Sequence, residues 1–197
     1  MSILITAGVT VVLAFTGYLV TYLNSLRLSQ RAERLARVNR QLAELYGPLF
    51  ALTQASDSAW MAFMEKYRPD SGVFFDDKKI SEADLRVWRT WMKTVFMPTN
   101  RRIYECILTK SDLLIETKMP QCLLDLCAHV ISYEPVLTAW NAGDYSEHLA
   151  LLNFPKDIVE YAHSSFEKLK EEQEKLMHGS PHKKGSQVTP ASHKGLC

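Results

Sequence analysis

The chain has 197 residues, of which 47% are hydrophobic and 23% charged, and its net charge is +1. Because a near-neutral chain has no global attraction to polyanions, we do not expect it to bind nucleic acid. Its four cysteines show no repeated spacing, which excludes a dense disulfide scaffold and favours a reducing compartment. The length allows about one domain after an anchor and a tail are subtracted.

Residues 3–23 form an apolar segment of 21 residues without a charged side chain. At 1.5 Å per residue such a helix is roughly 31 Å long, which matches the ~30 Å hydrocarbon core of a bilayer. Tyr18 and Tyr22 lie near its end, where aromatic rings favour the membrane interface. A cleaved signal peptide would need a positive start and a small-residue cleavage site, and this segment offers neither. The sequence therefore predicts a transmembrane anchor within residues 1–26.

Arginine residues follow the apolar segment, and no charged side chain precedes it. They are Arg27, Arg31, Arg34, Arg37 and Arg40. Because positive residues next to a span stay on the cytoplasmic side, we expect the N-terminus outside and the soluble domain in the cytosol. We also expect Arg27, Arg31 and Arg34 to contact anionic lipid head groups at the membrane surface.

A helical stalk is predicted over residues 27–47, with apolar residues at alternating steps of three and four. The stalk seam consists of Leu35, Val38, Leu42, Leu45, Leu49 and Leu52. Two covers are possible for this seam, namely an identical stalk in a parallel coiled coil or the chain's own helices. Arg31 interrupts the register and Pro48 lies within it, so we predict intramolecular packing and favour a monomer. At Gly47-Pro48 we expect a kink, because proline removes a helical hydrogen bond.

Residues 48–178 are predicted to form a helical bundle. Helical periodicity runs to Tyr67, and a loop follows whose Phe74-Phe75 pair either plugs the bundle or forms an exposed anchor for a partner. Ser81 and Asp84 resemble a capping box, although the usual third residue after the cap is Glu or Gln. The helix that they open has an apolar face containing Trp88, and we expect Arg89 to lie outside.

Prolines and a glycine mark the later helices of the predicted bundle. Pro98 is expected to kink or restart a helix, and Pro120 to begin another, which ends at Gly143. A last helix begins near Pro155, with Ile158, Ala162, Ser165 and Leu169 on its buried face. Residues 179–197 are polar, and we expect them to be disordered. The chain is thus predicted to be all-α: one transmembrane helix, a stalk, a four-helix-type bundle and a tail.

Cysteine and histidine residues offer no recognisable reactive or metal-binding motif. Cys122 and His129 share a helix face, whereas Cys127 lies on another. Without a known ligand spacing we expect no metal and no cofactor, with two core thiols and a surface histidine. Nothing local marks Cys106, Cys122 or Cys127 as a nucleophile.

The segment after Pro98 contains the best candidate for a ligand site. Trp91, Asn100, Arg101 and Arg102 combine an aromatic ring, an amide and two guanidinium groups, which could bind a phosphate or a carboxylate. A solvated helix face is the simpler interpretation of adjacent arginines. No catalytic residue is predicted.

Two functions remain open at this point, and we favour a membrane-tethered protein-interaction module, a scaffold or adaptor, over an enzyme. The alternative is a membrane-bound enzyme or small-ligand-binding bundle with a pocket near Arg101 and Arg102. A buried cluster of convergent polar groups would favour the alternative. A closed apolar core with these arginines in solvent would favour the module.

Overall fold

The computed structural model describes the backbone of residues 2–69, 74–75 and 80–178, and the side chains from residue 13 onward within these ranges. The described part is helical and contains no strand, so the all-α prediction is confirmed. The helices are α1 (Ser2–Gln41), α2 (Gly47–Tyr67), α3 (Glu82–Trp91), α4 (Met97–Thr109), α5 (Gln121–Asn141) and α6 (Asp157–His178). The predicted disordered tail, residues 179–197, lies outside the described residues.

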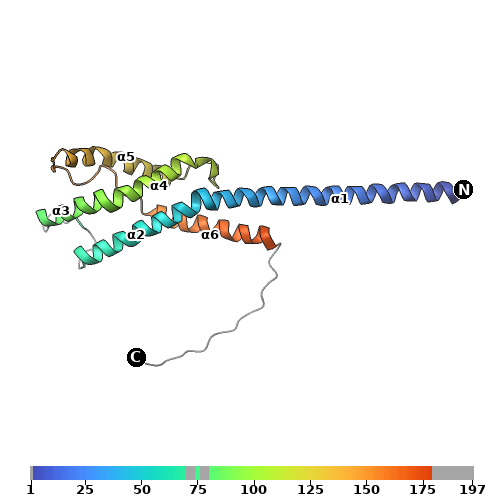
Figure 1. Cartoon of the computed structure of the whole chain (residues 1–197), viewed down its shortest axis with the longest axis horizontal. Helices are drawn as coiled ribbons and strands as arrows, with labels where there is room; N and C mark the ends of the chain where they lie inside the picture. Colours follow the sequence, from blue (N-terminus) through green and yellow to red (C-terminus); the bar gives the residue numbers. More distant parts are fainter. Residues whose placement is uncertain (1, 70–73, 76–79, 179–197) are drawn as a thin grey trace, which may run out of the picture.

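Two π-helical turns join four of these helices into two longer rods. The turn η1 (Leu42–Tyr46) connects α1 to α2, and η2 (Met92–Phe96) connects α3 to α4, whereas the 3-10 turn η3 (Ser111–Leu113) follows α4. The two rods, α5 and α6 form a closed bundle: α2 packs against α4 and α6, and α5 packs against the same two helices. The predicted helical bundle is therefore confirmed, and α1 projects far beyond it (Figure 1).

The first rod continues through Pro48 because η1 widens the helix just before the proline. Pro48 lies in the first turn of α2, where its missing N–H costs little. The Gly47 N–H bonds to the Leu42 carbonyl, and a Cβ at Gly47 would lie only 2.5 Å from that oxygen. The Cys106 thiol of α4 donates to the carbonyls of Glu44 and Leu45 at 3.7 Å, within the turn that the proline disrupts. The expected kink is thus a π-helical turn that only glycine fits.

Replacing Gly47 by alanine tests this close approach. Although alanine favours helices, its methyl group would push against a backbone carbonyl that cannot move aside. We expect Gly47→Ala to lower the free energy of unfolding by about 1–3 kcal/mol, as for other overpacked sites. Chemical denaturation of the full chain in detergent measures this. Gly17→Ala is the matched control, because no atom lies within 4 Å of a Cβ there, and equal stability of both variants would contradict the account.

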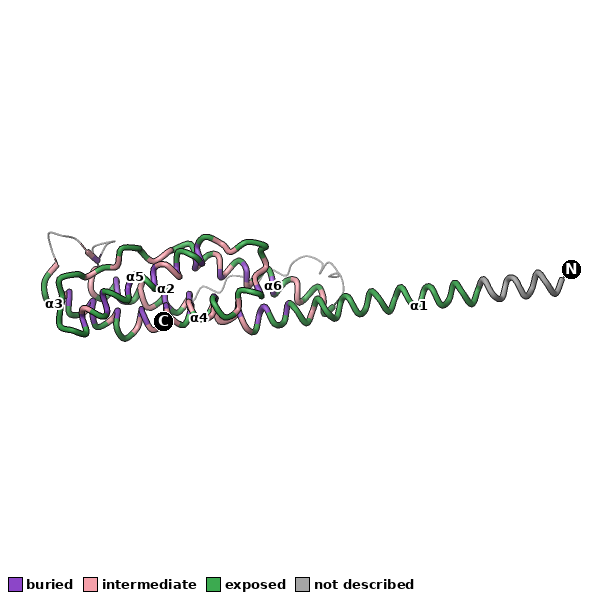
Figure 2. Tube along the Cα trace, turned by 90° about the horizontal axis from the view of Figure 1, so that it is seen from above, coloured by how far each residue is buried: buried purple, intermediate pink, exposed green. Residues whose placement is uncertain are grey.

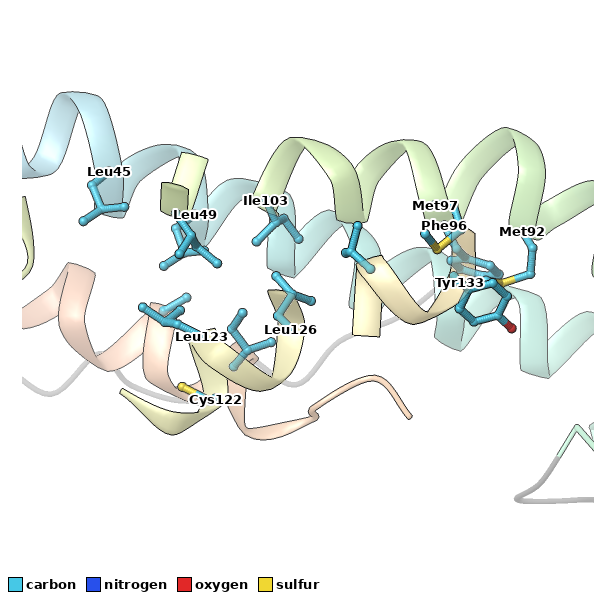
Figure 3. Packing of buried hydrophobic residues seen from close by; sticks show 14 of the residues in the cluster. Leu45, Leu49, Met92, Phe96, Met97, Ile103, Cys122, Leu123, Leu126 and Tyr133 are labelled. Atoms are coloured by element: carbon cyan, nitrogen blue, oxygen red, sulfur yellow. The ribbon is translucent and has the colours of Figure 1, made fainter. Parts of the chain in front are cut away.

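The bundle covers most of the stalk seam itself. Val38, Leu42, Leu45 and Leu49 are buried, and Leu35 and Leu52 are half-buried. Leu45 and Leu49 face Leu123 and Leu126 of α5 in the close-up (Figure 3), which shows that the seam belongs to the common core. The predicted buried face of α6 is confirmed, since Ile158, Ala162, Ser165 and Leu169 are all buried. Residues from Val38 onward therefore belong to both the stalk and the core, as the change from exposed to buried colours along α1 shows (Figure 2).

An aromatic cluster fills the end of the bundle farther from the N-terminus. The predicted capping box is present, with Ser81 and Asp84 each accepting from the other's backbone N–H. It opens α3, whose Trp88 packs at 5.3 Å from the Phe74 ring. Phe74 is buried, so the Phe74-Phe75 pair plugs the bundle. The expectation that Arg89 lies outside was wrong: it is buried, because its guanidinium pairs with Glu82 and lies over the Tyr145 ring.

The Trp88 ring is the centre of this cluster, and its removal tests how much the cluster stabilises the fold. Only 6% of Trp88 is exposed. We expect Trp88→Ala to lower the free energy of unfolding by about 3–5 kcal/mol, as for other large-to-small core changes. Met61→Ala is the control, because Met61 is 61% exposed and its loss should change stability by less than about 0.5 kcal/mol. An unchanged melting temperature for Trp88→Ala would contradict the packing.

Candidate functional site

The four residues predicted as a ligand site do not gather at one place. Asn100 is buried and turns toward α5, whereas Arg102 is exposed. Arg101 forms a two-pronged ion pair with Glu134 of α5, with Nε and Nη2 at 2.9 and 2.8 Å from its carboxylate oxygens. Trp91 is half-buried against Phe63, at 5.3 Å between ring centres. The Arg101 pair therefore ties α4 to α5.

Two open surface hollows in the described part of the chain lie elsewhere. One follows the outer side of α6 from Phe166 to His178, and the other lies beside residues 20–27 of α1. Neither includes the four candidate residues. No group of His, Cys, Asp and Glu side chains in the described ranges has the arrangement of a metal site.

The three cysteines of the bundle are poorly suited to nucleophilic chemistry. Burial raises the pKa of each thiol, that of Cys122 to about 11. Because the thiolate is the reactive form, a raised pKa disfavours nucleophilic attack by these thiols near neutral pH. Cys106 has a structural role as the donor to the π-helical turn described above.

Two tyrosines and a glutamate connect the first rod, α6 and the segment after η3. The hydroxyls of Tyr46 and Tyr161 lie 3.1 Å apart, and both contact the Glu116 carboxylate, at 3.3 and 3.0 Å. The Ile115 N–H donates to the Tyr46 oxygen at 3.0 Å. Burial raises the pKa of Tyr46 to about 12 and that of Tyr161 still further. Both phenols therefore stay protonated and act as hydrogen-bond donors that hold this junction.

The most unusual polar arrangement holds the α5–α6 loop, residues 142–156, against the bundle. Gly143, with a φ of 83°, ends α5 and turns the chain back. Buried ring nitrogens then bind three backbone carbonyls of the loop. Trp140 Nε1 donates to Glu147 at 2.7 Å and Trp88 Nε1 to His148 at 2.9 Å, while His129 Nδ1 lies 2.8 Å from the Leu152 oxygen.

His129 is the least expected member of this arrangement. It was predicted on the surface, but it is only 5% exposed, because the loop folds over it and Phe154 packs edge-on against its ring. Since a carbonyl only accepts, His129 Nδ1 carries the proton, and Nε2 can accept from the Asn100 amide at 3.5 Å. Burial lowers the pKa of His129, so the ring is neutral in the folded chain.

The buried neutral ring predicts a pH dependence of stability. In the unfolded chain histidine titrates near pH 6.5, whereas the folded pKa of His129 is lower. The unfolded state therefore takes up the proton first, and this contribution to stability is complete above pH 6.5 and declines as the pH falls. His129→Asn keeps an amide donor for Leu152 but does not titrate. We expect denaturation curves to show that the free energy of unfolding falls less between pH 7.5 and pH 5.5 in the variant than in the unmodified chain. An equal fall in both would contradict a lowered pKa of His129.

While the backbone of the α5–α6 loop turns inward, several of its large side chains turn outward. Leu151 is 95% exposed, and Tyr145, Leu149 and Leu152 are each exposed by more than 40%. Neither the inward carbonyls nor this surface was predicted from the sequence. One sequence feature could have indicated this surface. Gly143 ends one helix and Pro155 precedes the next, and the loop between them, where polar residues are usual, contains the apolar run Leu-Ala-Leu-Leu.

The arginines expected at the membrane surface have partners within the chain. Arg31 donates through Nε to the Leu176 carbonyl at 2.7 Å, and Arg34 forms an ion pair with Glu172. Gln173 donates to Asn39 at 2.7 Å, which extends the same contact between α1 and α6. Arg31 and Arg34 therefore contact the bundle, because α6 reaches back along α1. Arg27 is exposed.

Among the residues whose side chains the structure describes, one helix, α5, is long and apolar enough by composition to cross a membrane. In the most apolar stretch of α5, 44% of the residues are buried. Leu123, Leu126, Tyr133 and Trp140 all lie in the bundle core. Core helices of globular bundles have the same composition, so this finding is weak evidence for a span.

Comparisons with known proteins place the chain in no family. No protein-family model, no curated protein and no solved structure matches it. The function has to be derived from the chain's own residues.

Proposed function

We propose that the chain is a membrane-tethered helical interaction module, a scaffold or adaptor that its N-terminal helix holds at the cytosolic face of a membrane. Residues 3–23 would cross the bilayer, and the bundle would contact a protein partner. The observation that carries this proposal is that one helix has exposed side chains from residue 13 to residue 34, many of them apolar, and enters the bundle core from Val38 onward.

The exposed side chains of α1 between residues 13 and 34 support the tether. Every described side chain from residue 13 to residue 34 is exposed. Large apolar residues are among them: Leu13, Phe15, Tyr18, Leu19, Val20, Tyr22, Leu23, Leu26 and Leu28. Such a surface is a liability in water but is the favoured one in lipid, and the uncharged segment has the length that a bilayer needs.

The arginines after the span support the cytosolic orientation. Positive residues within about 15–20 residues of a span stay on the cytoplasmic side, and this chain places five there. The ion pair of Arg34 with Glu172 leaves 68% of the arginine side chain exposed, so it can also approach anionic head groups. Arg27, Arg31 and Arg34 therefore remain the residues proposed to contact the membrane surface.

The bundle supports the interaction part of the proposal. Besides the α5–α6 loop, it exposes Leu124 and Ile131 on the outer face of α5. Its own helices cover the stalk seam from Val38 onward, which favours a monomer over a coiled-coil dimer. A module of this kind acts by raising the local concentration of its partner at the membrane.

Membrane extraction and protease protection test the tether and its orientation. We expect the full chain to stay in the membrane during alkaline carbonate extraction, and a chain without residues 1–26 to be released. In intact right-side-out cells or vesicles, added protease should leave the bundle whole, and permeabilisation should expose it. Release of the full chain would overturn the anchor, and digestion without permeabilisation would overturn the cytosolic orientation.

A further inference from the structure

We infer that the α5–α6 loop is the docking surface of this module, and that it inserts leucine side chains into an apolar pocket bordered by Lys or Arg on a protein partner. This inference rests on the proposed function and adds to it the place of contact and the chemistry of the partner. The leucines concerned are Leu149, Leu151 and Leu152, and the carboxylates that would meet the partner's cations are Asp144, Glu147 and Asp157.

The apolar part of the surface is concentrated in a few consecutive residues. Leu149 is 43%, Leu151 95% and Leu152 47% exposed, and Tyr145 in the same loop is 47% exposed. A single exposed leucine is ordinary on a protein surface. Three leucines within four residues of an irregular segment form a patch, and patches of this kind mark interaction sites.

The loop is fixed rather than merely exposed. Trp140 and Trp88 donate their indole N–H groups to the Glu147 and His148 carbonyls, and His129 binds the Leu152 carbonyl. These three anchors lie on both sides of Leu149 and Leu151 and pull the backbone inward, which directs side chains outward. Because the loop is already ordered, a partner would lose little conformational entropy on binding it.

The charge around the loop indicates what kind of partner fits. In residues 142–157, the loop and the first residue of α6, the chain has three carboxylates and one lysine, a net charge of −2, although the whole chain has a charge of +1. Asp144, Glu147 and Asp157 are exposed, and none of them forms an ion pair within the described residues. An apolar patch with an acidic border is complementary to an apolar pocket with a basic border.

A lipid surface fits this patch poorly. Cytoplasmic leaflets are anionic and would repel the acidic border. In addition, α5 runs toward the end of the bundle that is farther from the N-terminus, so the loop lies away from the proposed span (Figure 1). These two features favour a protein partner over a membrane.

Site-specific photocrosslinking in cells tests the inference on the full chain. A photoreactive phenylalanine analogue such as p-benzoylphenylalanine replaces Leu149, and in a matched control it replaces Met61, an isolated and 61% exposed residue of α2. We expect a protein adduct from position 149 and none from position 61. Mass spectrometry should place the crosslink in a partner segment that is apolar and has a net positive charge.

Second substitutions in the chain carrying the analogue at position 149 separate the apolar and the charged contributions. Leu151→Asp and Glu147→Lys should each lower the adduct yield by at least about tenfold, as expected at the centre of an interface. Met61→Asp and Glu65→Lys make the same changes on α2 and should leave the yield unchanged. Circular dichroism melting curves should be the same for all four variants, since each replaced side chain is exposed.

Several outcomes would overturn the inference. The first is an adduct yield at position 149 no higher than in the position 61 control. The second is an adduct with lipid or with a second copy of this chain instead of another protein. The third is an adduct yield that the substitutions at positions 147 and 151 do not change. A heterologous protein adduct at position 61 alone would overturn the docking surface and leave the proposed interaction function standing. Failure of the tether is detected separately, by the extraction and protease experiments.

Discussion

The passage of a single rod through Pro48 is the constraint on which the rest of the structure depends. A proline inside a regular helix removes one hydrogen bond and clashes with the carbonyl four residues earlier. Here the wider turn at Leu42–Tyr46 accommodates both the lost hydrogen bond and the clash. Because Gly47 has no side chain, the Leu42 carbonyl can lie close to its backbone. Because α1 keeps its course into α2, its apolar seam packs along α6 over several turns and joins the common core. A sharp break at this point would stop α1 and α2 from packing along α6 as one rod.

The second rod uses the same solution. Pro98 lies in the first turn of α4, directly after the π-helical turn Met92–Phe96. Met92 and Phe96 of that turn are buried near Tyr133 (Figure 3), so the widened turn also contributes apolar side chains to the core. The two proline sites therefore do not divide the bundle into separate pieces. They produce two long antiparallel rods, and α5 and α6 complete the bundle against them (Figure 1).

Much of the fold could be predicted from local sequence signals, whereas the candidate site could not. The period of Ile158, Ala162, Ser165 and Leu169 is sufficient to define the buried face of α6, and the Ser81–Asp84 cap defines the start of α3. The predicted ligand residues Trp91, Asn100, Arg101 and Arg102 lie apart, because adjacent helical residues point in directions about 100° apart. The burial of His129 depends on a carbonyl 23 residues away. The spacing of apolar residues within α5 cannot indicate a contact with a loop that lies outside this helix.

The rod also determines where a partner could meet the bundle. The C-terminal end of α6 contacts Arg31, eight residues beyond Leu23, which corresponds to about 12 Å along α1. From Leu176 back to Asp157 there are 19 residues, roughly 29 Å of helix, so the first turn of α6 would lie roughly 41 Å from the end of the proposed span. Asp157 lies in that turn, and the α5–α6 loop leads into it. A partner that binds there must therefore extend well beyond the lipid surface. A small domain about 30 Å across that rests on the bilayer would not reach the loop, whereas one raised on its own stalk or linker would.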